Sequence, residues 1–210
     1  MRSTPARFPI HLRDTDAFPV RTSGVHLSGI LRAVAQRTNI LKPDKEDLDS
    51  ISSTIDPYLV GSHGGLMRWV IGYCWEDWMG SRVSGMTYHP GEIVLDGVIM
   101  TPDGIELSYL DGAYVLHEFK ATFKSSKKHV TETAMWMWQG MGYLAGMSAK
   151  YQEACTRAVY HVLHLRGDYS GIDPMYVATE VEFEEEEIRT AWGMIQQNKH
   201  LAKAEEHDGI

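Results

Sequence analysis

Two spacings of hydrophobic residues divide the chain into helical and extended segments. Apolar positions at helical spacing predict helices over residues 23–38, 66–83 and 131–150, and a last one that begins at residue 184. Runs rich in β-branched and aromatic residues predict strands over residues 92–101, 105–110, 113–123, 157–165 and 176–183. The sequence therefore predicts an α/β protein.

Asp-Gly pairs divide the middle of the chain into strands. Asp103-Gly104 and Asp111-Gly112 match hairpin turns and predict three antiparallel strands between residues 92 and 123. Asp103 and Asp111 are interpreted as turn formers and not as ligands. Asp96 interrupts the first strand instead, and we expect the pairing of its neighbours to bring it toward Glu118.

The strand over residues 113–123 carries two charged residues in an apolar run. Side chains two apart in a strand leave the same face, so Glu118 and Lys120 lie next to each other. Burying both charges costs several kcal/mol unless they pair or bind something. For an isolated Glu-x-Lys, a purely structural ion pair is the commoner explanation.

Other polar residues stand inside apolar helices. Glu76 falls within the aromatic helix over 66–83, although acids beside core tryptophans are also common on ordinary helices. Gln139 and Tyr143 are four apart and share a face of the helix over 131–150, whose Met and Trp content suits a core helix. Three carboxylates at a sheet edge suit Mg²⁺ or Mn²⁺. With a lysine to orient water, they can hydrolyse a phosphodiester.

The pattern resembles the PD-(D/E)xK nuclease superfamily, and within it the RecB-type and phage lambda-type exonucleases. The matching segments are Gly72-Tyr-Cys-Trp-Glu76, Leu95-Asp96-Gly97, Glu118-Phe119-Lys120 and Gln139-Gly-Met-Gly-Tyr143. Leu95 stands where the superfamily's name puts proline, a departure shared by RecB-type members. The resemblance spans about residues 61–143.

The resemblance implies a three-layer αβα, restriction-endonuclease-like core with a central mixed sheet flanked by helices. It also implies that Glu76, Asp96, Glu118 and the Phe119 carbonyl bind Mg²⁺ or Mn²⁺. Lys120 would then position the attacking water, and Gln139 and Tyr143 would orient Lys120 or the substrate phosphate. The four-cysteine iron–sulfur cluster of some members is excluded, because the chain has two cysteines.

The function implied is a metal-dependent DNA exonuclease. A phage-type single-strand annealing protein as a partner is compatible with this function, and so is a homo-oligomer. Two alternatives stay open. One is a structure-specific or restriction-type endonuclease on the same scaffold. The other is an inactive nuclease fold that serves as a DNA-binding or assembly subunit, which would have no reason to keep the acids and the lysine.

Length and charge change this interpretation only slightly. The 210 residues fit a single nuclease-like domain, with an irregular arm over about residues 1–21. Without a signal peptide or a membrane-spanning run, an intracellular, cytoplasmic, soluble protein is expected, and a phage origin is compatible. The net charge of −8 argues against wholesale coating of nucleic acid but does not exclude a nuclease whose site is itself acidic.

Local basic residues are the candidates for DNA contacts. Lys124, Lys127 and Lys128 form the most basic stretch and could contact the phosphate backbone. Ser28 and Arg32 are four apart, share a helix face and could grip a terminal phosphate. An ordinary solvent-facing Ser and Arg is the commoner explanation for that pair.

Overall fold

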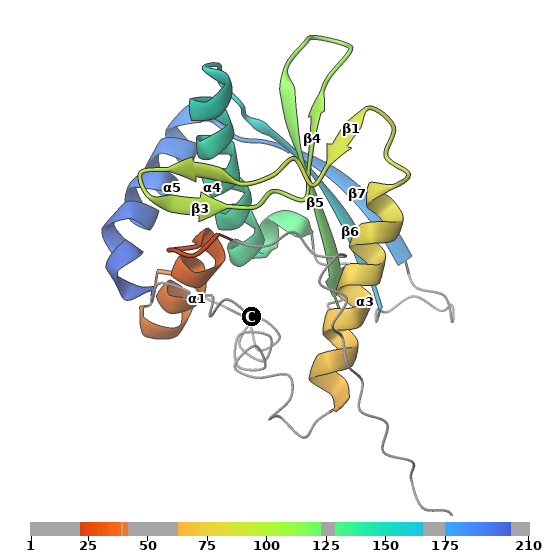
Figure 1. Ribbon diagram of the computed structural model, residues 1–210, viewed down its shortest axis with the longest axis horizontal. Coiled ribbons are helices and arrows are strands. Elements are labelled where there is room, and N and C mark those ends of the chain that lie inside the picture. Colours follow the sequence, from red (N-terminus) through yellow and green to blue (C-terminus); the bar gives the residue numbers. More distant parts are fainter. Residues whose placement is uncertain (1–21, 39, 42–62, 123–128, 166–174, 203–210) are drawn as a thin grey trace, which may run out of the picture.

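A mixed five-stranded sheet forms the centre of the protein (Figure 1). The computed structural model describes residues 22–38, 40–41, 63–122, 129–165 and 175–202. The strands of the sheet lie in the order β1 (Met86–Tyr88), β4 (Gly104–Leu107), β5 (Tyr114–Thr122), β6 (Arg157–His164) and β7 (Met175–Glu182). β5 and β6 are parallel and the other neighbours are antiparallel. The longest strand, β5, is therefore central.

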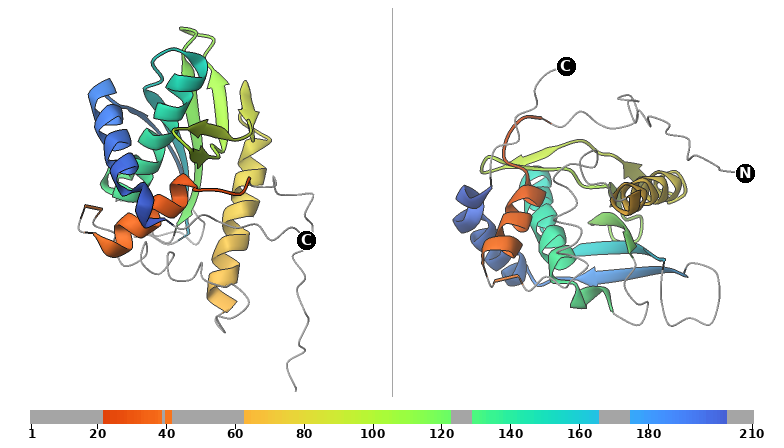
Figure 2. Two further views of the ribbon diagram at one scale, coloured as in Figure 1. Left: turned by 60° about the vertical axis from the view of Figure 1, so that its left-hand side comes forward. Right: turned by 90° about the horizontal axis from the view of Figure 1, so that it is seen from below.

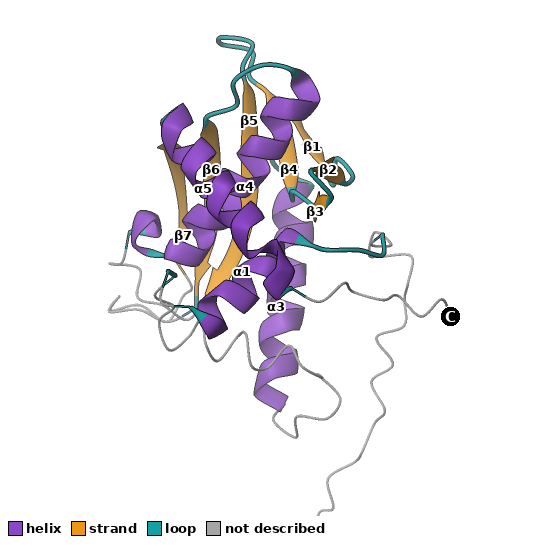
Figure 3. Ribbon diagram, turned by 90° about the vertical axis from the view of Figure 1, so that its left-hand side faces the viewer, coloured by secondary structure: helices purple, strands orange, loops and turns teal. Residues whose placement is uncertain are grey.

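Helices cover both faces of this sheet. The crossover helix α4 (Ala134–Tyr151) joins the parallel strands β5 and β6, and α5 (Glu185–Asn198) and α1 (Leu27–Arg37) pack beside it. Figure 3 shows these three helices in front of the sheet and α3 (His63–Gly80) behind it. The same separation is visible when the molecule is turned (Figure 2). Two short 3₁₀ helices, η1 (Val130–Glu132) and η2 (Lys199–Leu201), precede α4 and follow α5. The predicted α/β architecture, a central mixed sheet flanked by helices, is confirmed.

The two faces of β5 pack against different helices. Leu116 belongs to the main core together with Leu144 and Met147 of α4. Phe119 packs in a smaller cluster with Trp75 and Met79 of α3. Because side chains alternate along a strand, the face of Leu116 also carries Glu118 and Lys120. These two charged residues therefore point to the α4 side of the sheet.

The predicted strand over residues 92–101 is instead a separate hairpin. β2 (Ile93–Leu95) and β3 (Val98–Met100) form a two-stranded sheet that packs on α4. Asp96 and Gly97 form the turn, with φ angles of 49° and 70°. A two-residue turn with positive φ at both positions matches the twist of a hairpin, and Asp-Gly is among the pairs that favour it. Asp96 is thus a turn residue and not a strand residue.

Some predictions fall on parts of the chain that are not described. The irregular arm over residues 1–21 lies outside the described residues, and so do Lys124, Lys127 and Lys128. Within the described part, no helix has the length and apolar character needed to cross a membrane.

Candidate active site

The Glu118–Lys120 pair lies inside the protein on β5. Glu118 has no exposed surface, and its Oε2 accepts a hydrogen bond from Lys120 Nζ at 2.6 Å. The Lys120 side chain is 16% exposed, so one end of the pair borders solvent. Glu118 Oε1 is buried and has no hydrogen-bond partner. Because an orphaned buried carboxylate oxygen is costly, this atom indicates a place built to bind something.

Asp103 is the second acid of the cluster, which the sequence reasoning missed. Its Oδ2 accepts a hydrogen bond from the backbone N–H of Phe119 at 2.9 Å and lies 3.9 Å from Lys120 Nζ. It immediately precedes β4, whose first residue Gly104 pairs with His117 of β5. Pro102 stands directly before it, so Pro102-Asp103 spells the first part of the PD-(D/E)xK pattern. That dipeptide was the signal that could have identified it.

Asp96, by contrast, is not brought to Glu118, and the expectation that it lies there is wrong. Its Oδ2 accepts a hydrogen bond from Trp192 Nε1 of α5 at 3.0 Å, and its carbonyl accepts one from Lys199 Nζ. The hairpin turn explains this position, since it directs Asp96 toward α5 and η2 and away from β5. The interpretation of Asp103 as a mere turn former is wrong for the same reason. Asp96-Gly97 forms the hairpin turn, and Asp103-Gly104 supplies the acid of the cluster.

Burial and mutual repulsion shift the pKa values of the acids. The pKa of Asp103 is held well above its ordinary value by burial and by the nearby Glu118 carboxylate. Burial also raises the pKa of Glu118, although Lys120 opposes this. Burial would lower the pKa of Lys120, but Glu118 and Asp103 outweigh it and raise that pKa. Lys120 is therefore a firm cation here, able to donate hydrogen bonds but not to accept a proton.

Gln139 and Tyr143 reach the same cluster from α4. Gln139 Nε2 donates a hydrogen bond to the Tyr143 hydroxyl at 2.9 Å, as expected for residues one turn apart. The Tyr143 ring is buried, and burial together with the Glu118 and Asp103 carboxylates raises the pKa of its hydroxyl. The hydroxyl therefore stays protonated and lies within the electrostatic reach of Lys120.

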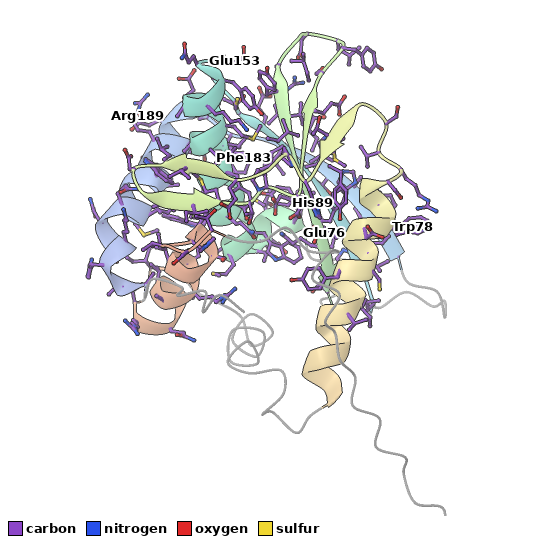
Figure 4. The ribbon with its side chains drawn as sticks, viewed as in Figure 1. Glu76, Trp78, His89, Glu153, Phe183 and Arg189 are labelled. Carbon is purple, nitrogen blue, oxygen red and sulfur yellow. The ribbon has the colours of Figure 1, made fainter. Side chains whose placement is uncertain are left out.

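Glu76 approaches from α3. Its charge contributes to the raised pKa values of Asp103 and Glu118, so it is within electrostatic range of both. Its Oε1 contacts His89 Nε2 at 2.9 Å. His89, which directly follows β1, carries no sequence signal that would have singled it out. Figure 4 labels both side chains, between α3 and the end of β1.

The residues proposed to grip a DNA end come from a different helix, α1. Ser28 and Arg32 are half-buried on α1, which packs against α4, α5 and β3. A role for them in gripping a DNA end stays a prediction.

A divalent cation fits the chemistry of this cluster. Within the described ranges, no group of three or more His, Cys, Asp and Glu side chains is arranged closely enough to hold a metal ion together. Glu76 is held by His89, and one Glu118 oxygen is held by Lys120. However, the pKa values of Asp103 and Glu118 are raised, and Glu118 Oε1 has no partner. A hard cation would reduce the repulsion between the two carboxylates and give this oxygen a partner. The donor set is all oxygen, as Mg²⁺ and Mn²⁺ prefer.

The opposite face of β5 carries a buried chain of hydrogen bonds. Glu106 Oε2 contacts His117 Nε2 at 3.0 Å, His117 Nδ1 contacts His161 Nε2 at 2.9 Å, and His161 Nδ1 contacts the Tyr176 hydroxyl at 2.8 Å. Neutral imidazoles satisfy all three contacts if each group donates toward Glu106. Burial lowers the pKa of both histidines, that of His161 to about 4. His117 thus faces away from Glu118, as its position in the strand predicts.

Comparison with known proteins adds solved structures only. No protein-family model matches the chain, and no curated protein matches it. The chain is similar to a phage-related exonuclease from Haemophilus somnus 129PT, with 9% identity over 85% of this chain and 92% of that one and a TM-score of 0.43. It is also similar to LHK-Exo in complex with dAMP, with 16% identity over 84% and 88% and a TM-score of 0.44. A third similar structure is SSO0001, with 11% identity over 86% and 78% and a TM-score of 0.44. At these values, function has to be inferred from the side chains of the site.

Proposed function

We propose that this protein is a metal-dependent DNA nuclease and that it acts as an exonuclease. The observation that supports the proposal is the cluster of Asp103, just before β4, with Glu118 and Lys120 of β5, in which one buried Glu118 oxygen has no partner. A structural ion pair would satisfy both oxygens of its acid, and this one does not. The spacing of the three residues also completes the Pro-Asp … Glu-x-Lys pattern.

Mg²⁺ or Mn²⁺ held by Asp103, Glu118 and Glu76, with the Phe119 carbonyl as a further ligand, would supply charge neutralisation of the phosphate and activation of water. The residues of the chain do the rest. Lys120 donates hydrogen bonds to the attacking water or to a phosphate oxygen. Its raised pKa keeps it an ammonium, so it acts as a positive charge and a hydrogen-bond donor and not as a base.

Gln139 and Tyr143 have a positioning role in this proposal. The Gln139 amide fixes the Tyr143 hydroxyl, so the hydroxyl can donate its proton toward an anionic oxygen in the cluster. A phenol with a raised pKa is a neutral donor that does not add to the negative charge of the site. This suits a phosphodiester, whose charge the acids would otherwise repel.

Exonuclease action and its partners are the finer part of the proposal. Ser28 and Arg32 on α1 are proposed to engage a free DNA end, and Lys124, Lys127 and Lys128 to contact the backbone. A single-strand annealing protein is the proposed partner, and assembly of several copies is compatible with end-directed digestion. The inactive-scaffold alternative is not supported, because the cluster keeps both acids and the lysine.

A digestion of matched linear and covalently closed DNA tests the proposal. Linear duplexes labelled at either end should be degraded from the ends in Mg²⁺ or Mn²⁺, and excess EDTA should stop the reaction. Closed circles should survive under the same conditions. Rapid linearisation of the circles would indicate the endonuclease, whereas cleavage in EDTA, or no cleavage of any substrate with either metal, would contradict the nuclease.

A further inference from the structure

His89 links two acids of the candidate site, which arrive from different elements. Its Nε2 lies 2.9 Å from Glu76 Oε1 on α3, a contact that one tautomer makes as a donor to the carboxylate. Its backbone N–H donates to the Asp103 carbonyl at 3.0 Å. One residue therefore fixes the carboxylate of Glu76 and aligns the segment that carries Asp103.

The backbone of His89 is strained in a way that serves this contact. Its φ is 47°, in the left-handed region that residues other than glycine seldom occupy. The last pair of the β1–β4 ladder is Tyr88 with Gly104, so the chain turns at His89 immediately after that strand. The His89 ring stacks on Tyr88, with the centroids 3.8 Å apart. A strained residue at a site is retained where the strain positions a group that is needed there.

The neighbouring packing keeps α3 close to this turn. A Cβ on Gly80, the last residue of α3, would overlap the Tyr88 ring, so the absence of a side chain permits the contact. The Tyr88 ring also meets Phe119 of β5 edge-on at 6.4 Å. Burial and the charges of Glu76, Asp77 and Asp103 raise the pKa of the Tyr88 hydroxyl, which is within electrostatic range of these acids. His89 thus lies where α3, β1 and the Asp103 segment meet.

We infer that His89 is a positioning residue for the metal-binding acids, and that it holds the Glu76 carboxylate in place through Nε2. This rests on the proposed function, because it assigns a partner to an acid of the same site. Carboxylates that bind metal are themselves held by hydrogen bonds, and the loss of such a partner lowers metal affinity by about 10- to 100-fold. His89 is the residue that supplies this bond to Glu76.

Three variants separate the ring from the backbone. His89→Ala removes both the donor and any preference for the left-handed region. His89→Asn keeps a residue that tolerates positive φ but cannot reach Glu76, and His89→Gln restores a longer amide donor. His200→Ala is the matched control, since His200 is exposed on η2, where its Nδ1 contacts the Gln197 carbonyl.

Mn²⁺ titration by calorimetry on metal-free protein is the primary measurement, with circular dichroism as the folding check and cleavage as a second reading. We expect His89→Ala and His89→Asn to weaken Mn²⁺ binding by about 10- to 100-fold, and His89→Gln to recover most of the affinity. His200→Ala should bind like the parent.

Parental or tighter Mn²⁺ binding by His89→Asn, while the parent protein binds Mn²⁺ and cleaves DNA, would overturn the role of His89 alone. If the parent neither binds Mn²⁺ nor cleaves DNA, the proposed function itself fails and the inference fails with it. Should His89→Ala not fold, His89→Asn and His89→Gln still decide the matter, since both keep a polar side chain at the turn.

Discussion

Replacing Asp103 by asparagine should remove activity and yet make the metal-free protein more stable. Asparagine has nearly the same shape, and its Oδ1 can still accept the hydrogen bond from the Phe119 N–H that Asp103 receives at 2.9 Å. What is lost is a negative charge next to Glu118. We compare it with Asp96→Asn, which changes the same residue type at an exposed turn where asparagine tolerates the positive φ.

The magnitude follows from the charges around Asp103. Lys120 Nζ at 3.9 Å attracts the carboxylate by about 4 kcal/mol at an effective dielectric constant of about 20. Burial and Glu118 outweigh this attraction, because the pKa of Asp103 is held well above its ordinary value. We therefore expect Asp103→Asn to raise the free energy of unfolding by about 1 to 3 kcal/mol at pH 8.

The size of the stabilisation by Asp103→Asn depends on pH in a way that can be measured. A carboxyl whose pKa is raised on folding is unfavourable once the pH exceeds its unfolded value of about 3.9, and the whole penalty is present above the folded pKa. The stabilisation by Asp103→Asn should therefore be largest at neutral and alkaline pH and vanish below about pH 4. Asp96→Asn should change stability by less than about 0.5 kcal/mol at any of these values.

Urea unfolding in EDTA across pH 4 to 8, and digestion of end-labelled DNA in Mg²⁺, provide the two readings. Asp103→Asn should show no detectable digestion, while Asp96→Asn should digest at close to the parental rate. The reasoning is refuted if Asp103→Asn cleaves normally or loses stability at pH 8. An inactive Asp96→Asn with an active Asp103→Asn would return the catalytic role to Asp96.

Two further substitutions test the remaining charges. Lys120→Met should end digestion but leave Mn²⁺ binding intact, and should cost roughly 3 kcal/mol of stability because Glu118 loses its buried partner. Calorimetry measures the Mn²⁺ binding and urea unfolding the stability. Cleavage at the parental rate would show that the ion pair is structural. His161→Gln should flatten the acid limb of the stability curve, because a histidine with a pKa of about 4 stabilises the fold fully above pH 6.5 and loses that contribution, roughly 2 kcal/mol, as the pH falls toward 4. If the parent and His161→Gln lose the same unfolding free energy between pH 7 and pH 4.5, His161 does not titrate this way.

The fold was predictable where a long segment keeps a single spacing of hydrophobic residues. The strand over residues 113–123 is β5, and the helix over residues 131–150 is α4, within one to three residues at each end. The acids from Glu184 onward open α5, where the Glu184 and Glu187 side chains form a capping box. In each case local propensity and tertiary packing agree, so the local pattern was sufficient.

The hairpin at Asp96 and the acid at Asp103 were not predictable in the same way. Both are Asp-Gly pairs, and turn propensity is a property of the dipeptide alone. What distinguishes them is β5, since Gly104 pairs with His117 and so brings Asp103 to the Phe119 N–H. Only the partner strand decides which pair is a turn. His89 was beyond reach for a related reason, because its contact with Glu76 depends on a turn after a three-residue strand.

Two unusual features of the described residues meet at one cluster. Elsewhere in the described residues there are ordinary ion pairs, such as Arg157 with Asp111 at the start of β6. At β5, by contrast, a fully buried glutamate keeps an oxygen without a partner, and a histidine with positive φ holds the neighbouring Glu76. The cluster holds more carboxylates than cations, so it would repel a phosphodiester until its charge is reduced. Binding of DNA at this site should therefore require a cation, which ties the acidity of the chain to its proposed chemistry.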